Sequence, residues 1–177
     1  PTITLDQISI SGATNFTFSI DMIAHHYNDW DSGDELLIKY SLDGGSSQNL
    51  MWVQNNGATY NQTASLDSDF DGDGECDDVL PALTTGTSGC TTSSSIFETF
   101  TTSEIALSSN STLDITLEFN GFEATDEGIY LDNIVITTSS SSVANPSVFA
   151  LEYATSDKIS LTWTAPSGTY DNVLVFG

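Results

Sequence analysis

Apolar and polar residues alternate along several short segments of this chain, and this alternation limits the possible folds more than any other feature. Residues 113–119 read Leu-Asp-Ile-Thr-Leu-Glu-Phe, and residues 15–22 show the same two-residue period. Successive side chains of a β-strand point to opposite faces, so this period is typical of a half-buried strand. Similar patterns predict strands at residues 2–10, 35–41, 49–54, 96–101 and 129–137. Seven short strands and no convincing helix predict an all-β protein, an antiparallel β-sandwich.

Two local signals refine this prediction. Residues 42–45 read Leu-Asp-Gly-Gly, and Asp-Gly and Gly-Gly supply the positive φ angles of a tight hairpin turn. Within residues 2–10 the alternation changes phase near Asp6 and Gln7, which predicts a bulge or an edge strand there.

An acidic loop follows the fourth predicted strand. Asp or Glu occupies every second position from Asp67 to Asp77, and Gly72 and Gly74 lie between them. Calcium takes six to eight oxygen ligands, and loops supply them from alternate positions around a glycine-permitted turn. With Asp67 as position 1 of an EF-hand-like loop, the candidate calcium ligands are Asp67, Asp69, Asp71, Asp73, Glu75 and Asp78. The alternative is a solvated acidic loop, because runs of like charge are often disordered.

The charge balance narrows the classes of partner. Asp and Glu number 25 and Lys and Arg only 2, which gives a net charge of -23. Nucleic acids and anionic membranes are bound through cationic side chains, so neither is expected as a direct partner. Such a charge favours cation binding.

Few residues suit catalysis. The two histidines, His25 and His26, are adjacent, and on a strand they would face opposite ways. Neither a nucleophile elbow nor a zinc-protease helix motif occurs, so no enzymatic activity is expected. A carboxylate pair for glycoside hydrolysis stays open, because only spatial separation identifies one.

Cys76 and Cys90 are the two cysteines of the chain. A disulfide between them is predicted, because unpaired cysteines are uncommon in polar loops. It would close a loop of about fifteen residues, worth roughly 3 kcal/mol in the chain-entropy model. Disulfides persist outside the cytosol, so a secreted or cell-surface location is expected. No apolar stretch of about 18 residues is present, and no membrane insertion is expected.

The pattern changes after residue 138. Serines and Asn145-Pro146 predict a linker over residues 139–146. Further strands are predicted at residues 148–153, 158–163 and 172–175. Residues 159–166, Ile-Ser-Leu-Thr-Trp-Thr-Ala-Pro, resemble the second strand of a fibronectin type III domain, with Trp163 as its core tryptophan. Residues 147–177 would then be part of such a domain.

Two motifs of the first 138 residues resemble a known family. Residues 33–45, Gly-Asp-Glu-Leu-Leu-Ile-Lys-Tyr-Ser-Leu-Asp-Gly-Gly, and residues 130–136, Tyr-Leu-Asp-Asn-Ile-Val-Ile, look like the jelly-roll modules of secreted Bacteroidetes surface proteins. These modules are similar to MAM and cleaved-adhesin domains. The acidic loop resembles a thrombospondin type 3 calcium repeat, in which a disulfide pins the loop.

The resemblance implies an extracellular adhesion or carbohydrate-binding module, of a kind often exported by type IX secretion. It also implies that Asp132 helps to hold a structural cation, with an acidic partner from Asp21, Asp29, Asp31 or Asp34. The alternative is that Asp132 caps a turn through its own backbone.

Four aromatic residues near loops are candidates for sugar stacking: Tyr27, Trp30, Trp52 and Tyr60. Trp52 lies between Met51 and Val53 and is expected in the core. Trp30, within a polar segment, and Tyr27 are the preferred carbohydrate-binding candidates.

The expected function is therefore a Ca²⁺-stabilised adhesion or surface-assembly module of a larger secreted protein. Its partners would be extracellular polysaccharide or a cell-surface protein, and neighbouring domains of the same polypeptide. The alternatives are a calcium-dependent carbohydrate-binding module and an accessory domain of a secreted hydrolase or nuclease.

Overall fold

The computed structural model describes residues 1–55, 62–72, 74–125, 127–140, 147–154 and 159–164. The chain divides into two compact units, Pro1–Ser139 and Ser140–Gly177. The described residues contain strands and no helix, so the all-β prediction is confirmed. Among the described residues there is no helix that could cross a membrane.

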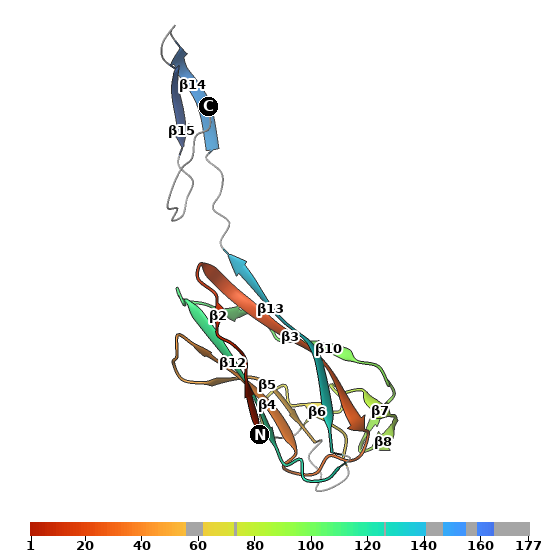
Figure 1. The fold of residues 1–177 in the computed structure, drawn as a ribbon. Coiled ribbons are helices and arrows are strands. Elements are labelled where there is room, and N and C mark those ends of the chain that lie inside the picture. Colours follow the sequence, from red (N-terminus) through yellow and green to blue (C-terminus); the bar gives the residue numbers. More distant parts are fainter. Residues whose placement is uncertain (56–61, 73, 126, 141–146, 155–158, 165–177) are drawn as a thin grey trace. The chain divides into compact units, whose positions relative to one another are not determined.

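The larger sheet of the first unit has six strands (Figure 1). Its centre is the antiparallel pair of β12 and β4, in which Ile115 lies opposite Tyr40. The hairpin turn predicted at residues 42–45 joins β4 to the segment before β5, with φ angles of 51° at Asp43 and 69° at Gly44. The strands of this sheet are β1 (Thr2–Thr4), β2 (Ile8–Ser9), β4 (Glu35–Leu42), β5 (Gln48–Gln54), β6 (Ser65–Leu66) and β12 (Thr112–Asn120).

The second sheet is built on β3 (Ala13–His26), the longest strand. Four strands pair with it: β7 (Ala82–Thr84), β10 (Glu98–Thr101), β11 (Ile105–Ala106) and β13 (Ile129–Ser140). The pairing with β7 is parallel, with Ala24 opposite Ala82. This one pair departs from the antiparallel arrangement that was predicted. A separate hairpin joins β8 (Gly86–Ser88) and β9 (Cys90–Thr92).

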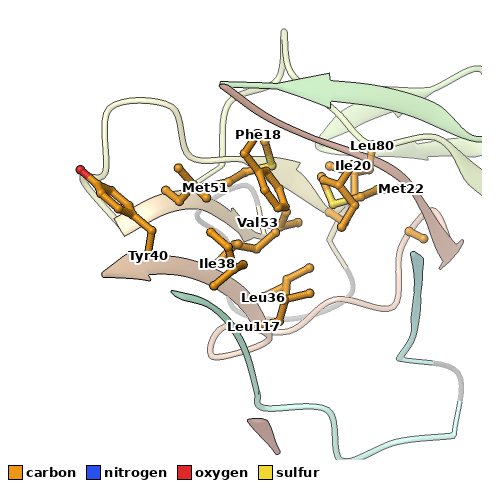
Figure 2. Close-up of a cluster of buried hydrophobic side chains, with 14 of the residues drawn as sticks. Phe18, Ile20, Met22, Leu36, Ile38, Tyr40, Met51, Val53, Leu80 and Leu117 are labelled. Carbon is orange, nitrogen blue, oxygen red and sulfur yellow. The ribbon is translucent and has the colours of Figure 1, made fainter. Parts of the chain in front are cut away.

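The core lies between the two sheets, and alternation along the strands explains it. Every second residue of β3 from Phe16 to Ala24 is buried, and so are alternate residues of β4 and β12. Figure 2 shows Phe18, Ile20 and Met22 of β3 meeting side chains of β4 and β5. Full burial of one large aliphatic or aromatic side chain contributes roughly 1.5–3 kcal/mol. This core therefore fixes the register of both sheets, because a one-residue slip would expose it.

The predicted strands correspond to observed ones, with two differences. The segment at residues 2–10 is broken into β1 and β2 around Asp6 and Gln7, where the phase change was seen. The strand predicted at residues 96–101 begins only at Glu98. The unpredicted strands have two or three residues each, too few to show a period: β6, β7, β8, β9 and β11.

The second unit contains one antiparallel hairpin of β14 (Ser147–Ala154) and β15 (Ile159–Thr164). These strands were predicted. The strand expected at residues 172–175 and most of the expected linker, residues 141–146, lie outside the described residues.

Candidate metal centre

Three carboxylates meet in the acidic loop that follows β6. Asp67, Asp69 and Asp71 each offer an oxygen atom, and these atoms lie within 4.8 Å of one another. Calcium binds oxygen at about 2.3–2.6 Å, so two ligands on opposite sides of an ion lie about 5 Å apart. Asp67 is buried, whereas Asp69 and Asp71 are exposed. The group can therefore hold a hard cation at the protein surface.

Asp67 organises the backbone of this loop. Its Oδ1 accepts a hydrogen bond from the Asp71 N–H at 3.1 Å, and its Oδ2 accepts one from the Gly72 N–H at 2.9 Å. The Phe70 N–H also bonds to this carboxylate. A carboxylate has about four acceptor positions, so Asp67 can serve the loop and a cation together.

Burial raises the pKa of Asp67 above its usual value. The N–H groups of Gly72, Phe70 and Asp71 oppose this shift, and the charge of Glu75 adds to it. The carboxylate thus sits where its negative charge is only partly compensated. A bound cation would supply the missing compensation.

The other predicted ligands of the loop have different places. Glu75 Oε2 accepts a hydrogen bond from the Ser68 N–H at 3.0 Å and so closes the loop. Asp78 is exposed, and its backbone carbonyl accepts a hydrogen bond from the Leu66 N–H at 3.0 Å. Neither belongs to the group of three, and Asp73 lies outside the described residues.

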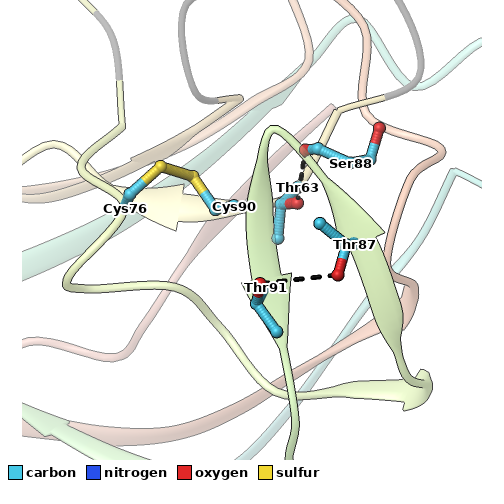
Figure 3. Close-up of a disulfide and its surroundings, with 6 residues drawn as sticks. All are labelled: Thr63, Cys76, Thr87, Ser88, Cys90 and Thr91. Atoms are coloured by element: carbon cyan, nitrogen blue, oxygen red, sulfur yellow. Dashed lines mark hydrogen bonds between the residues drawn. A yellow bond between two sulfur atoms is a disulfide. The ribbon is translucent and has the colours of Figure 1, made fainter.

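Covalent and steric constraints hold the end of the loop. The predicted disulfide between Cys76 and Cys90 is confirmed, with Cα atoms 5.1 Å apart. Figure 3 shows it joining the loop to β9, beside the Thr63–Ser88 hydrogen bond. Gly74 packs so closely that an added Cβ would lie 2.6 Å from the Ser65 Cβ. The loop is thus fixed to the sandwich directly after its three carboxylates.

A second acidic cluster was not predicted as a unit. Asp34 is 3 % exposed, and its Oδ2 accepts a hydrogen bond from the Asp31 N–H at 2.6 Å. Burial raises the pKa of Asp34 to about 6, the Asp31 N–H opposes the shift, and the charges of Glu127, Asp31 and Glu123 add to it. Both glutamates come from the segment between β12 and β13. Their convergence on Asp34 needs the pairing of β4 with β12, which local sequence does not reveal.

Asp132 lies on the exposed strand β13, outside the group of three carboxylates. Its Oδ1 accepts a hydrogen bond from the N–H of the next residue, Asn133, at 2.8 Å. Asn133 has a φ of 51°. This is the local cap that was the alternative to cation binding at Asp132.

The predicted exposure of Trp30 is wrong. Trp30 is fully buried, and its ring meets the edge of Phe122 at a centroid distance of 5.1 Å. Its backbone pairs with Gln62 in both directions, at 3.1 and 2.8 Å. Polar neighbours in the sequence concealed this long-range pairing. A buried ring cannot stack on a sugar.

Tyr27 is half-buried, and its ring packs 4.7 Å from the ring of His26. An added Cβ on Gly86 would lie 2.5 Å from the Tyr27 ring, so glycine is needed beneath it. Tyr60 lies outside the described residues.

The placement of Trp52 in the core is also wrong. Trp52 is half-buried, while its neighbours Met51 and Val53 are buried. Its indole N–H donates to Glu35 Oε2 at 2.8 Å, and its ring stacks with Phe70 at 6.4 Å and 24°. In a strand, a residue flanked by two buried ones faces the other side. The sequence therefore held the signal that Trp52 faces outward.

The two histidines contact different groups, as expected for neighbours on β3. His25 lies 6.2 Å from the Tyr130 ring, and His26 Nδ1 lies 3.4 Å from a carboxylate oxygen of Asp29.

A pocket of about 350 Å³ lies beside the acidic loop. It is lined by β4 and β5 of the larger sheet, by the start of the acidic loop, and by residues 101–103 and 105 at the end of β10 and the start of β11. Trp52 and Phe70 are both among its lining residues.

Comparisons with protein-family models, with curated proteins and with solved structures find no match to this chain.

Proposed function

We propose that this chain is a calcium-stabilised adhesion or surface-assembly module of a larger secreted protein. The observation that supports the proposal most is the group of Asp67, Asp69 and Asp71, whose oxygens meet in a loop already shaped by backbone hydrogen bonds. The disulfide fits an oxidising compartment. The resemblance to jelly-roll surface modules supplies the adhesion part of the proposal.

Calcium suits this site better than softer metals. All three ligands are carboxylates, whereas zinc and copper sites generally include imidazole or thiolate. Calcium also tolerates the incomplete and flexible ligand sets of surface loops. With a net charge of -23, the whole protein favours cation binding over anion binding.

The ion would stabilise the fold by mass action. A ligand that binds only the folded protein adds RT ln(1 + [L]/Kd) to the free energy of unfolding. Extracellular calcium modules have a Kd of about 10⁻⁴–10⁻³ M. At about 5 mM calcium and a Kd of about 0.5 mM, the gain is roughly 1.4 kcal/mol. For a unit of this size that corresponds to a rise in Tm of about 3–8 °C.

Thermal unfolding in about 5 mM CaCl₂ and in EDTA tests the proposal. We expect calcium to raise the Tm of the parent protein by several degrees and to leave the Asp69→Ala/Asp71→Ala variant unchanged. The matched control is Asp6→Ala/Asp77→Ala, which removes the same charge from two exposed positions outside the carboxylate group. The control should keep the calcium shift. Equal Tm values of the parent protein in both buffers would refute calcium stabilisation.

Adhesion is tested separately, by binding of the fluorescently labelled protein to bacterial cells in calcium and in EDTA. Calcium-dependent binding would support a surface module. Binding in neither buffer would contradict adhesion and favour the role of accessory domain to a secreted hydrolase or nuclease.

A further inference from the structure

We propose that the pocket beside the acidic loop binds a neutral saccharide, with Trp52 and Phe70 as its stacking residues. The pocket has a volume of about 350 Å³. This lies at the lower end of the range for small-molecule sites, about 300–1,000 Å³. It suits one or two sugar units or the end of a chain. The inference rests on the proposed function in one respect, because the loop that would hold calcium also forms one wall.

The aromatic wall is the first observation. Phe70 is 41 % exposed, Trp52 is half-buried, and the two rings stack at 6.4 Å. The hydrogen bond from the Trp52 indole to Glu35 fixes the orientation of that ring. Sugars present C–H groups on one face, and this face packs on flat aromatic rings. Rings that are accessible and already oriented lose little side-chain entropy on binding.

The backbone at Phe70 is the second observation. Phe70 has a φ of 61°, a conformation that costs a residue with a side chain roughly 1–2 kcal/mol. For a bulky residue it is an outlier, and such strain is concentrated at functional sites. The Asp67 carboxylate holds this conformation through the N–H groups of Phe70 and its neighbours. The strained backbone places a large apolar ring at the surface, where core packing gains little from it.

The polar lining is the third observation. Exposed Asn49, Ser68, Thr101 and Ser103 line the pocket, and their amide and hydroxyl groups both donate and accept hydrogen bonds. They match the hydroxyls of a sugar. Apolar residues complete the wall, and Figure 2 shows two of them, Tyr40 and Met51, at one end of the core.

The charges of the lining select against ionic ligands. None of its described residues is Lys, Arg or His, and its one charged residue is Asp67. The Asp67 oxygens already bond to the loop backbone. An acidic glycan would meet no Lys, Arg or His side chain here, the three carboxylates outweigh the +2 charge of a bound calcium ion, and the net charge of -23 would repel it. A neutral saccharide therefore fits best.

Calcium would act on this site by positioning. Phe70 lies between Asp69 and Asp71, two of the three carboxylates that meet. An ion held by them restrains the residue between them. Saccharide binding should therefore be stronger in calcium than in EDTA, without any need for the ion to touch a sugar hydroxyl.

A glycan array tests the inference, with neutral oligosaccharides as probes and uronate oligosaccharides as the charge control, in about 5 mM CaCl₂. Calorimetry on the best neutral probe then compares variants. We expect Phe70→Ala and Trp52→Ala each to weaken binding about tenfold or more. The matched control is Phe97→Ala, which removes a ring that is 44 % exposed and lies outside the pocket lining. It should leave affinity unchanged.

Thermal unfolding verifies that each variant is folded. If Trp52→Ala does not fold, Trp52→Phe replaces it; this variant keeps a ring and should retain part of the affinity. The inference would be overturned if only uronate probes bound or if no neutral probe bound. Equal losses of affinity in Phe97→Ala and Phe70→Ala would also overturn it. A calcium-dependent rise in Tm without glycan binding would reject the pocket and keep the proposed calcium site. Neutral glycan binding with no calcium effect on Tm would keep the saccharide pocket and reject the proposed calcium site.

Discussion

Two buried aspartates, Asp67 and Asp34, show different ways of placing a carboxylate inside the same sandwich. Both are almost inaccessible, at 1 % and 3 % exposure. Asp67 accepts hydrogen bonds from three backbone N–H groups of its loop. Asp34 accepts one, from Asp31, and lies near the negative charges of Glu123 and Glu127.

The difference lies in what compensates each charge. Burial raises both pKa values, that of Asp34 to about 6. Backbone donors favour the charged form, and nearby anions favour the protonated form. At Asp67 three backbone donors therefore offset part of the cost of burying the charge, and a cation would offset more of it. The Asp34 region takes up a proton more readily.

The largest expected effect in this comparison is that of Asp67→Ala. The change removes the acceptor of the Gly72 and Phe70 N–H groups and leaves the Asp71 N–H only its bond to Asp69 Oδ1 at 3.2 Å. Hydrogen bonds to charged groups contribute about 1.5–3 kcal/mol each. We expect the free energy of unfolding in EDTA to fall by about 3 kcal/mol or more, measured by urea denaturation. Asp34→Asn, which keeps the shape and removes a poorly compensated charge, should cause no such loss at pH 7. Equal losses would mean that backbone donors do not distinguish the two sites.

Each region also contains a tightly packed glycine. Replacing either glycine alone should lower the free energy of unfolding by an intermediate amount. An added Cβ on Gly121 would lie 2.5 Å from Asp34 Oδ1, at a φ of +86°, and one on Gly74 would lie 2.6 Å from the Ser65 Cβ. We expect Gly74→Ala to cost about 1–3 kcal/mol from overpacking, and Gly121→Ala to cost more because its backbone is strained too. Both are measured as losses in the free energy of unfolding.

Gly12→Ala is the control for the cost that comes from the positive φ angle alone. Gly12 has a φ of +82°, and nothing lies within 4 Å of its added Cβ. It should cost only about 1 kcal/mol. A loss for Gly12→Ala as large as that for Gly121→Ala would show that packing against Gly33 and Asp34 contributes little.

A pH dependence is expected at Asp34, measured as the free energy of unfolding in EDTA. Its pKa in the folded protein is about 6, against 3.8 for the free side chain. The folded state therefore binds the proton more tightly, and this contribution to stability is complete below pH 3.8 and is lost as the pH rises through about 6. Asp34→Asn should remove this slope and be more stable than the parent at pH 8. An unchanged slope in the variant would assign the titration to another group.

Asp43 should show the opposite pH dependence of stability. Hydrogen bonds from the N–H groups of Ser111 and Thr112 lower its pKa. Its contribution is present above the ordinary pKa of 3.8 and is lost as the pH falls further. Asp43→Asn should therefore lower the free energy of unfolding at neutral pH and flatten its fall below pH 3.8, measured by urea denaturation across pH.

The sequence predicted the sandwich well because its longer strands contain their own evidence. The alternation in β3, β4 and β12 is a local property, and so is the Asp-Gly-Gly turn. The acidic loop was also predictable, because its carboxylates are neighbours in the sequence. Features that depend on distant pairing were not. The burial of Trp30 depends on Gln62, and the Asp34 cluster depends on Glu123 and Glu127.

Trp52 is a different case, because a local signal was present and pointed to the right face. Met51 and Val53 are buried on one side of β5, so the residue between them faces the other side. The pocket it lines also needs Phe70, which comes from the acidic loop, and residues 101–103 and 105, which come from the other sheet and its connection. The sequence could place Trp52 at a surface, whereas only the structure could place it beside a pocket.

The disulfide has a consequence for survival among proteases. Cys76 and Cys90 are 14 positions apart, and the segment between them is rich in Gly, Thr and Ser. Its exposed polar stretches are of the kind at which proteases preferentially cut. A cut anywhere between the two cysteines leaves both pieces covalently joined. A protein nicked there therefore remains one molecule, with its acidic loop tethered to the hairpin beside it.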